Sequence, residues 1–238
     1  MLVDVCLTPA LIQDHGPAPD LVVVADIYRA TTCMCVAFQQ GVKNIKPILS
    51  LEEGIGLKKD HNWIIAGERG GQKAEGFDLG NSPFEFLQFD LAEQNLAMTT
   101  TNGTRAIHSV SSQSKLLIGS FLNISAIATY CQETLRDNGQ LLILCSGWQN
   151  KISLEDTLLA GALIEKLYSV ADFKNDEPML AYSFWKQSKS RLPETVRTFS
   201  HAERLMRLGF EKDLDFCLQQ DITDLIPVYD HQNQLLSL

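Results

Sequence analysis

Short apolar runs alternate with helical patterns over the first 145 residues, and this order constrains the fold more than any other feature of the chain. Residues 21–26 (LVVVAD) form a continuous apolar run that ends on Asp26, which is typical of a strand buried on both faces. Residues 30–41 then follow a helical pattern that ends at Gly41, a residue suited to a helix C-terminus. The repeated strand–helix order predicts a three-layer α/β/α fold with a mostly parallel or mixed central sheet.

The same alternation supplies most of the expected elements. Further strand candidates are residues 44–49, 62–67, 95–100, 115–120, 140–145 and 224–230. Ser50 with Glu53 has the spacing of a capping box at the start of another helix, and residues 123–139 and 154–169 are typical of longer helices. Because helical patterns continue to Leu218, we expect one domain over residues 1–238 with a helical C-terminal third.

The charge and composition limit the partners of this chain. A net charge of −9 argues against a nucleic-acid surface, because phosphate backbones are bound through clustered Lys and Arg. No apolar run approaches the roughly 18 residues of a membrane span, and the start MLVDVCLTPA does not resemble a secretory signal. We therefore expect a cytoplasmic protein that binds neither nucleic acid nor membrane. A homodimer is the expectation for an oligomer of this kind.

The six cysteines include no CxxC pair, and most of them lie in apolar segments. This pattern favours reduced, buried thiols over a zinc site or a disulfide framework.

Three loops that follow expected strands carry the candidate chemistry, because ligands of open parallel sheets bind beyond the carboxyl ends of the strands. The first loop reads DIYRATT (residues 26–32). Asp26 can hold a metal ion or act as a nucleophile or base, and Arg29 can bind an oxyanion. The hydroxyl groups of Thr31 and Thr32 add donors at a helix N-terminus. Alternatively, Asp26 only caps the helix and Arg29 is solvated.

The second loop reads GERGGQKAEGFDLGNS (residues 67–82) and contains five glycines, which let the backbone approach a ligand closely. Arg69 can bind an oxyanion, and Glu68, Glu75 and Asp78 offer the hard oxygen ligands that Mg²⁺ prefers. The alternative is a mobile acidic turn.

The third loop reads TTTNGTRA (residues 99–106) and again connects a strand to a helix through a tight Asn-Gly turn. Its polar positions are Thr100, Thr101, Asn102, Thr104 and Arg105. An ordinary turn with threonine caps is the alternative. Considered together, the three loops combine Arg29, Arg69 and Arg105 with three carboxylates, a mixture that suits Mg²⁺ and a small phosphorylated, anionic substrate.

For two later segments the sequence allows more than one role. Ser153 with Asp156 has the spacing of a capping box, although Glu155 and Asp156 could also reach the site. Ser200 with Glu203 is likewise typical of a cap, with His201 and Arg204 on the first turn of the helix. A lone histidine at such a position is more often a surface residue than a general acid.

Four segments, DIYRATT, GERGG, GFDLGNSP and TTTNGTRA, in this order and spacing resemble the 2-phosphosulfolactate phosphatase family of coenzyme M biosynthesis. The C-terminal stretch RLMRLGFEKDLDFCLQQDITDLIPVY is similar to the ending of that family as well, so the resemblance covers nearly the whole chain. It implies a Mg²⁺-dependent phosphatase that hydrolyses (R)-2-phospho-3-sulfolactate to 3-sulfolactate and phosphate.

Together, the motifs and the resemblance predict the site residues. Catalytic roles are expected for Asp26, Arg29, Glu68 and Arg69. Metal binding is expected for Asp26, Glu68 and Asp78. Substrate contacts are expected from Thr31, Thr32, Asn81, Ser82, Thr101, Asn102, Gly103, Thr104 and Arg105.

Alternatives remain for the reaction itself. Because the strand end carries Tyr28 where aspartyl-phosphate phosphatases have a second Asp, we favour a metal-activated water over a covalent aspartyl intermediate. A phosphatase of another small 2-phospho acid, a non-catalytic phosphate- or sulfonate-binding protein, and an isomerase or lyase that releases no phosphate are the competing hypotheses. Carboxylates in the first two loops favour the enzyme, since a binder of phosphate gains nothing from added negative charge unless a metal neutralises it.

Overall fold

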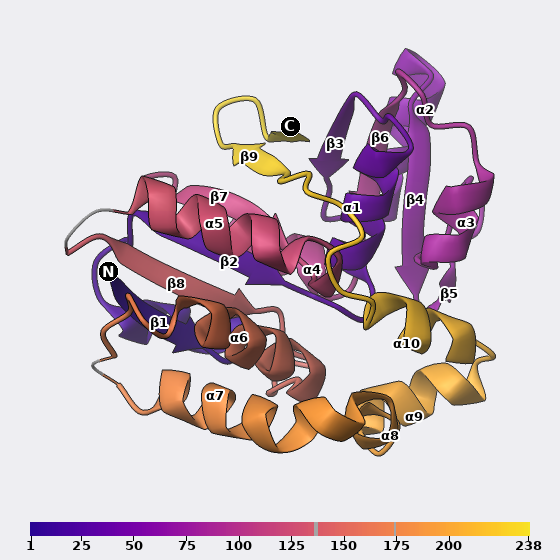
Figure 1. Cartoon of the computed structure of the whole chain (residues 1–238). Helices are drawn as coiled ribbons and strands as arrows, with labels where there is room; N and C mark the ends of the chain where they lie inside the picture. The colour runs from indigo at the N-terminus through magenta and orange to yellow at the C-terminus, as the bar shows by residue number, and fades with distance from the viewer. Residues whose placement is uncertain (136–137, 174) are drawn as a thin grey trace.

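The computed structural model describes residues 1–135, 138–173 and 175–238, and over these residues it contains one ten-stranded sheet with helices on both faces (Figure 1). The strands are β1 Leu2–Cys6, β2 Leu21–Ala25, β3 Asn44–Pro47, β4 Ile64–Arg69, β5 Gln72–Lys73, β6 Asn95–Thr99, β7 Lys115–Gly119, β8 Gln140–Cys145, β9 Val228–Asp230 and β10 Leu235–Ser237. The helices are α1 Ala30–Gln39, α2 Leu51–His61, α3 Pro83–Gln88, α4 Gly103–Ser109, α5 Ile124–Thr134, α6 Leu154–Leu167, α7 Glu177–Ser188, α8 Leu192–Val196, α9 Ser200–Arg207 and α10 Glu211–Cys217. The expected α/β/α fold with a helical C-terminal third is confirmed.

The sheet consists of two parallel groups of strands joined by an antiparallel hairpin. Its order is β1-β8-β2-β7-β9-β10-β3-β6-β4-β5. Strands β1, β8, β2 and β7 pair in parallel, and so do β3, β6 and β4. The hairpin of β9 and β10 lies between the groups and is antiparallel to both of its neighbours. In Figure 1 the two groups run in different directions, and the ends of β2 and β4 both approach α9 and α10.

The continuous apolar sequence of β2 follows from burial on both faces, as expected. Leu21, Val23 and Ala25 pack into the core that contains α5, α6 and α7. Val22 and Val24 pack into the opposite core, with α1 and α4. A central parallel strand therefore has no polar face, and its first polar side chain, Asp26, comes at its carboxyl end.

Helices α6 and α7 approach each other so closely that only glycine fits at position 161. A Cβ atom on Gly161 would lie 2.1 Å from the carbonyl oxygen of Ala181 and 2.6 Å from Cβ of Trp185. This contact fixes α6, whose first turn carries Glu155 and Asp156.

The helix caps and strand limits show which predictions from local sequence are confirmed and which are wrong. The Ser50 and Ser153 side chains accept hydrogen bonds from the Glu53 and Asp156 amides, which confirms both caps. The cap predicted at Ser200 is wrong, because α9 already includes this residue and its N-cap is Phe199. The sequence signals missed β1, β5 and β10, which are two to five residues long. Strand β1 is held by pairing with the distant β8, whereas β5 and β10 pair with β4 and β9, which are close in sequence. Residues 136–137 of the helix expected at 123–139 lie outside the described residues.

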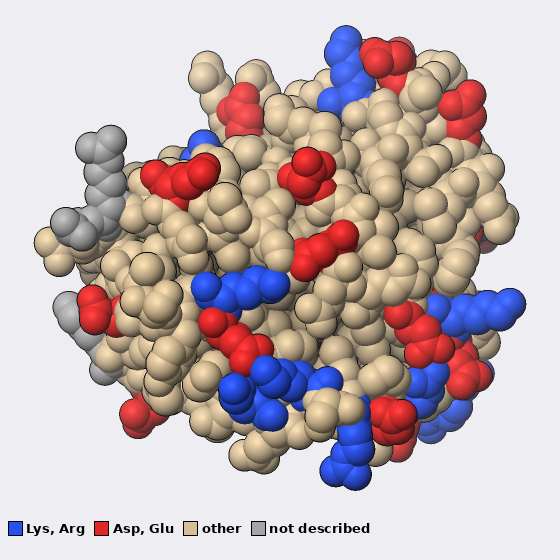
Figure 2. All heavy atoms as spheres, in the orientation of Figure 1, with Lys and Arg blue, Asp and Glu red and all other residues tan. Residues whose placement is uncertain are grey.

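All six cysteines are buried and free, as expected. Among the described residues, no helix is long and apolar enough to cross a membrane. On the face drawn in Figure 2, basic side chains over α6 and α7 lie beside acidic ones. Ion pairs account for part of this interleaving, since Glu165 contacts both Lys186 and Lys189.

Candidate active site

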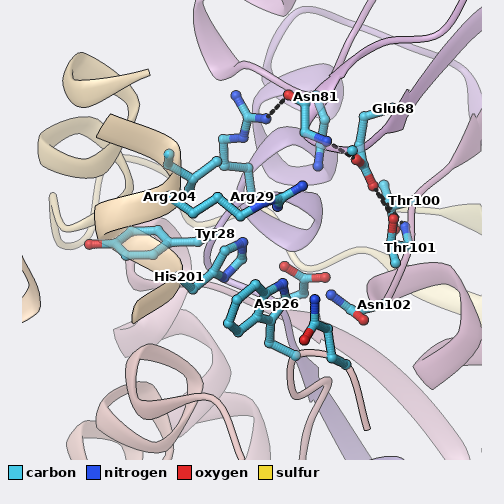
Figure 3. A pocket seen from close by; sticks show the side chains of 15 residues that line it. Asp26, Tyr28, Arg29, Glu68, Asn81, Thr100, Thr101, Asn102, His201 and Arg204 are labelled. Carbon is cyan, nitrogen blue, oxygen red and sulfur yellow. Dashed lines mark hydrogen bonds between the residues drawn. The ribbon is translucent and has the colours of Figure 1, made fainter. Parts of the chain in front are cut away.

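A cavity of about 130 Å³ lies where the ends of β2, β4, β6 and β8 approach α9 (Figure 3). Its walls come from both parallel groups of the sheet: Asp26 follows β2, Glu68 belongs to β4, and Thr100 follows β6. Trp148 from the loop after β8 and His201 from α9 complete the wall. The strand-end loops therefore converge, although they belong to two strand groups and not to one uniformly parallel sheet.

Asp26 lies at the centre of this cavity and is almost fully buried, with 7% exposure. Its backbone is fixed because the Asp26 amide donates to Thr31 Oγ1, while Oδ1 accepts only a long 3.4 Å hydrogen bond from the Ala30 amide. Glycine is required at position 103, since a Cβ there would lie 2.8 Å from Asp26 Oδ2. Burial raises the pKa of Asp26 to about 6, against the opposing effect of His201. Asp26 thus presents a carboxylate with unused lone pairs.

Glu68 joins two of the predicted loops. Oε1 accepts hydrogen bonds from the amide and hydroxyl of Thr101, at 2.9 and 2.6 Å, and Oε2 accepts one from the Gly71 amide at 2.7 Å. Although burial opposes the change, these hydrogen bonds lower the pKa of Glu68. Three of its roughly four lone-pair sites are thus occupied, so Glu68 holds the two loops in register.

Arg29 is buried beneath the cavity and is neutralised by an acidic partner. Its Nη1 donates to Asp213 Oδ2 at 2.6 Å, and Nη2 donates to the Gly71 carbonyl. The guanidinium also stacks 4.1 Å from the centre of the Phe210 ring. Ser82 donates to the other carboxylate oxygen of Asp213. Arg29 therefore anchors α10 to the site, and Nε remains without a hydrogen-bond partner.

Arg204 supplies the cavity with a cation that is not neutralised in this way. It lines the same wall as His201 and lies 6.0 Å from the centre of the Trp148 ring. Within the described part of the chain, no ion pair or hydrogen bond involves the Arg204 guanidinium. It is thus available to an anionic ligand.

His201 is held against a buried carboxylate. The Nδ1 atom lies 2.6 Å from Glu155 Oε1, and Glu155 is 2% exposed. The imidazole stacks on Trp148, with the ring centres 5.2 Å apart and the planes within 6°. The expectation of a surface histidine is wrong, because α9 packs its first turn against the start of α6.

Asp156 fixes the loops behind the site. Oδ1 accepts from the Ile27 amide and Oδ2 from the Gly147 amide, so this carboxylate joins the loops after β2 and β8. Burial raises the pKa of Asp156 well above its ordinary value, and Asp26 contributes in the same direction. Of the two roles left open for Asp156, the structure shows the capping of α6 together with this link between loops.

The donor atoms of the cavity suit Mg²⁺ bound together with a substrate. Among the described residues, no three His, Cys, Asp or Glu side chains gather as a metal site. Mg²⁺, however, is usually held by one or two carboxylates, with water and substrate phosphate oxygens completing its shell. Asp26 offers such a carboxylate. Asn81 is 93% buried and lines the cavity, and its Oδ1 has no hydrogen-bond partner in the described part of the chain. These two side chains fit the ion.

The structure brings some of the predicted site residues to the cavity. Those that line it are Asp26, Arg29, Glu68, Asn81, Thr101 and Asn102. Four others hold the loops from behind: Thr32 donates to the Ile27 carbonyl, Thr104 exchanges hydrogen bonds with Thr100, and Thr31 and Ser82 bind Asp26 and Asp213 as described above. Because residue 103 is a glycine, its backbone can lie close to the Asp26 carboxylate.

The three remaining predicted residues neither line the cavity nor contact Asp26. Asp78 is paired with Lys58 and accepts from the Ile65 amide, so its carboxylate is directed to α2 and β4. Arg69 is exposed and donates to the Glu68 carbonyl, while Arg105 is exposed on α4. The cationic side of the cavity comes instead from Arg204.

Sequence reasoning missed the contribution of α9 and of the loop after β8. The residues concerned are Trp148, Gln149, His201, Arg204 and Leu205, and Tyr28 in the loop after β2 was missed as well. The one available signal was the segment SHAER, in which His201 and Arg204 are three positions apart and so share a helix face.

The described residues of the cavity include a carboxylate, an arginine without a partner among them, and hydroxyl and amide groups at the ends of an α/β sheet, a combination suited to binding a small anion. The family model of 2-phosphosulpholactate phosphatase matches residues 6–232. Proteins described as probable 2-phosphosulfolactate phosphatases are similar over almost their whole length. The relative from Caldanaerobacter subterraneus subsp. tengcongensis is 39% identical, covering 91% of this chain and 90% of its own. The relative from Thermotoga maritima is 34% identical, covering 95% and 94%. The relative from Synechocystis is 36% identical, covering 92% of each.

The chain belongs to the 2-phosphosulfolactate phosphatase family, and the resemblance noted from its motifs is confirmed. The expected class of enzyme, a phosphoric monoester hydrolase, is confirmed at the level of this family.

Proposed function

We propose that this protein hydrolyses the phosphate monoester (R)-2-phospho-3-sulfolactate to 3-sulfolactate and phosphate, with Mg²⁺ as its cofactor. The observation that carries the proposal is the pairing, in one cavity of a chain of this family, of an incompletely hydrogen-bonded Asp26 carboxylate with an arginine free to bind an anion.

The distribution of charge suits a substrate with several anionic groups. Arg204 carries the positive charge that is not cancelled by a neighbouring carboxylate, so it binds one anionic group of the substrate. The Thr100 hydroxyl and the Asn102 amide lie on the opposite wall and are suited to phosphoryl or carboxylate oxygens. Trp148 and Leu205 supply apolar surface that excludes water from the cavity.

Asp26 and Asn81 are the residues that would hold Mg²⁺. When bound, the ion would polarise a phosphoryl oxygen and neutralise part of the negative charge of the substrate. Glu68 and Asp156 act indirectly, since they keep the loops around Asp26 in place through the hydrogen bonds described above.

The decisive experiment measures phosphate release from 2-phospho-3-sulfolactate, from 2-phospholactate and from an aryl phosphate. Each substrate is tested with Mg²⁺ and with a chelator. Mg²⁺-dependent release that favours the sulfonated substrate supports the proposal. Equal rates with and without the sulfonate would assign the protein to another small 2-phospho acid. Binding of the substrate without phosphate release would identify a non-catalytic anion-binding protein.

A further inference from the structure

We propose that His201 is a catalytic residue that donates a proton to the leaving-group oxygen of the substrate, and that Glu155 is the positioning residue that holds it. The inference rests on the proposed phosphatase function and adds a step to it. Hydrolysis of an alkyl phosphate ester generates an alkoxide, which is a poor leaving group unless it is protonated as the ester bond breaks.

The contact with Glu155 fixes which nitrogen of His201 faces the substrate. With Nδ1–H donating to Glu155 Oε1 at 2.6 Å, Nε2 is the nitrogen left for the cavity. No hydrogen bond among the described residues uses Nε2 of this ring. Glu155 is 2% exposed, so its buried carboxylate holds Nδ1 and fixes the direction in which Nε2 points.

Aromatic neighbours fix the plane of the ring. Trp148 stacks on His201 with planes within 6°, and Tyr28 meets it edge-on with ring centres 6.4 Å apart. Figure 3 shows the imidazole of His201 on the Asp26 side of Tyr28, while the Tyr28 hydroxyl points away from the cavity. An imidazole that is held on two sides loses little freedom when a substrate binds, which suits proton transfer at a defined atom.

The other groups of the cavity wall are poorer proton donors. Arg29 and Arg204 remain charged at all ordinary pH values. Burial raises the pKa of Tyr28 far above its usual range, so its hydroxyl donates a proton poorly. Asp26 is assigned to Mg²⁺ and the reacting phosphoryl group. The Glu68 carboxylate is occupied by hydrogen bonds from Gly71 and Thr101. Among the described residues that line the cavity, His201 is then the side chain with a ring nitrogen that can both donate and accept a proton.

Protonation of the leaving group accompanies cleavage of the ester bond. The bond between phosphorus and the ester oxygen breaks, and its electron pair stays on that oxygen, which takes the proton from His201 Nε2. The oxygen of a water molecule forms the new bond to phosphorus. One hydrogen of this water stays on the phosphate product, and the other is released as a proton that restores the imidazolium.

The test compares two leaving groups in one set of variants. 2-Phospho-3-sulfolactate releases a basic alkoxide, whereas p-nitrophenyl phosphate releases a phenolate that departs without protonation. For His201→Gln we expect kcat on the alkyl ester to fall by about 10²-fold or more, with less than about a 3-fold change on the aryl ester. Glu155→Gln keeps a hydrogen-bond acceptor without the charge. Its kcat should fall less than that of His201→Gln, and again more on the alkyl ester than on the aryl ester.

His15 is a second histidine that pairs with a carboxylate, and it serves as the matched control. Nδ1 of His15 lies 2.8 Å from Asp4 Oδ2, but this residue lines a different cavity. His15→Gln should leave both rates unchanged. If His201→Gln lowers kcat equally on the two substrates, His201 is not the proton donor. Absence of turnover of 2-phospho-3-sulfolactate by the unmodified enzyme would instead contradict the proposed function.

A second measurement decides the matter if the unmodified enzyme does not accept the aryl ester. Nitrogen NMR of the histidine rings, assigned with His201→Gln, is recorded with and without the product 3-sulfolactate. Protonated Nδ1 in the free enzyme and a shift confined to Nε2 of His201 on addition of product are expected. An unshifted Nε2 would overturn the inference.

Discussion

Arg29 and Asp213 form a buried ion pair although 184 positions separate them in the chain, and the pair joins the start of α1 to α10 at the base of the cavity. The two side chains are 2% and 4% exposed. Removal of one partner leaves the other charge buried without compensation, which costs far more than the loss of an exposed ion pair.

Asp213→Asn should therefore lower the free energy of unfolding by about 3–5 kcal/mol. Urea denaturation at pH 7 measures the change. Asp215→Asn, in the same helix, removes an exposed partner of Arg197 and should cost less than about 1 kcal/mol. Similar decreases in the free energy of unfolding of the two variants would show that burial of the Arg29–Asp213 pair has no special effect.

Asp26→Asn should abolish most turnover while making the protein more stable at alkaline pH. The pKa of Asp26 is about 6 in the folded protein, whereas the ordinary value for an aspartate is 3.8. Between these values the unfolded chain loses its proton first, so the native protein loses stability as the pH rises. Above pH 6 the buried charge of Asp26 lowers the free energy of unfolding by its full amount, about 3 kcal/mol. Below pH 3.8 this destabilisation vanishes.

Thermal denaturation in the presence of a chelator tests this sign. The variant should melt at a higher temperature than the unmodified protein at pH 8, and the difference should disappear towards pH 4. A difference that stays constant with pH would mean that Asp26 is not titrated in this range.

Arg204→Gln should weaken substrate binding more than it slows the chemical step. Loss of a hydrogen bond to a charged group costs about 1.5–3 kcal/mol, so we expect KM to rise by about 10-fold or more while kcat changes less. Arg207→Gln, one helical turn further on and exposed, is the matched control. Steady-state kinetics with 2-phospho-3-sulfolactate distinguish the variants. A loss of kcat at constant KM would contradict the binding role.

Glu165→Gln should reduce stability at neutral pH, and the reduction should be lost in acid. Although burial opposes the change, hydrogen bonds from Lys189, Trp185 and Lys186 lower the pKa of Glu165 to about 2. A lowered folded pKa contributes stability above the ordinary value of 4.5, and the contribution fades as the pH falls from 4.5 towards 2. The difference in urea midpoint should therefore be the same at pH 7 and pH 5.5 and decrease at pH 4. A difference that grows at pH 4 would refute the assignment.

The sequence predicted the fold well because its strongest signals are local. The apolar run of β2 and the Ser50 and Ser153 caps depend on neighbouring residues, and all of them are present in the structure. Short strands such as β10 carry no comparable signal, because three residues are too few to show a pattern. Strand β10 is held by pairing with its neighbour β9 and with the more distant β3.

The cavity was predicted only in part, for the same reason. Asp26, Glu68 and Asn102 belong to strand ends, so the topology of an α/β sheet indicated their neighbourhood. His201 and Arg204 reach the cavity because α9 packs across the sheet, and the pairing of His201 with Glu155 joins residues 46 positions apart. Arg69 and Asp78 illustrate the opposite case: each occurs in a suggestive motif, but its local hydrogen bonds direct it elsewhere.

The position of the β9–β10 hairpin has a consequence for the order in which the molecule is completed. Both parallel groups are synthesised before residues 228–237, yet these residues lie between the groups in the finished sheet. While the chain is still emerging from the ribosome, the β2 side and the β4 side of the cavity can each form, but no strand connects them. Asp26 and Glu68 therefore come to lie on one continuous sheet only once residues 228–237 have been synthesised and have paired with both groups.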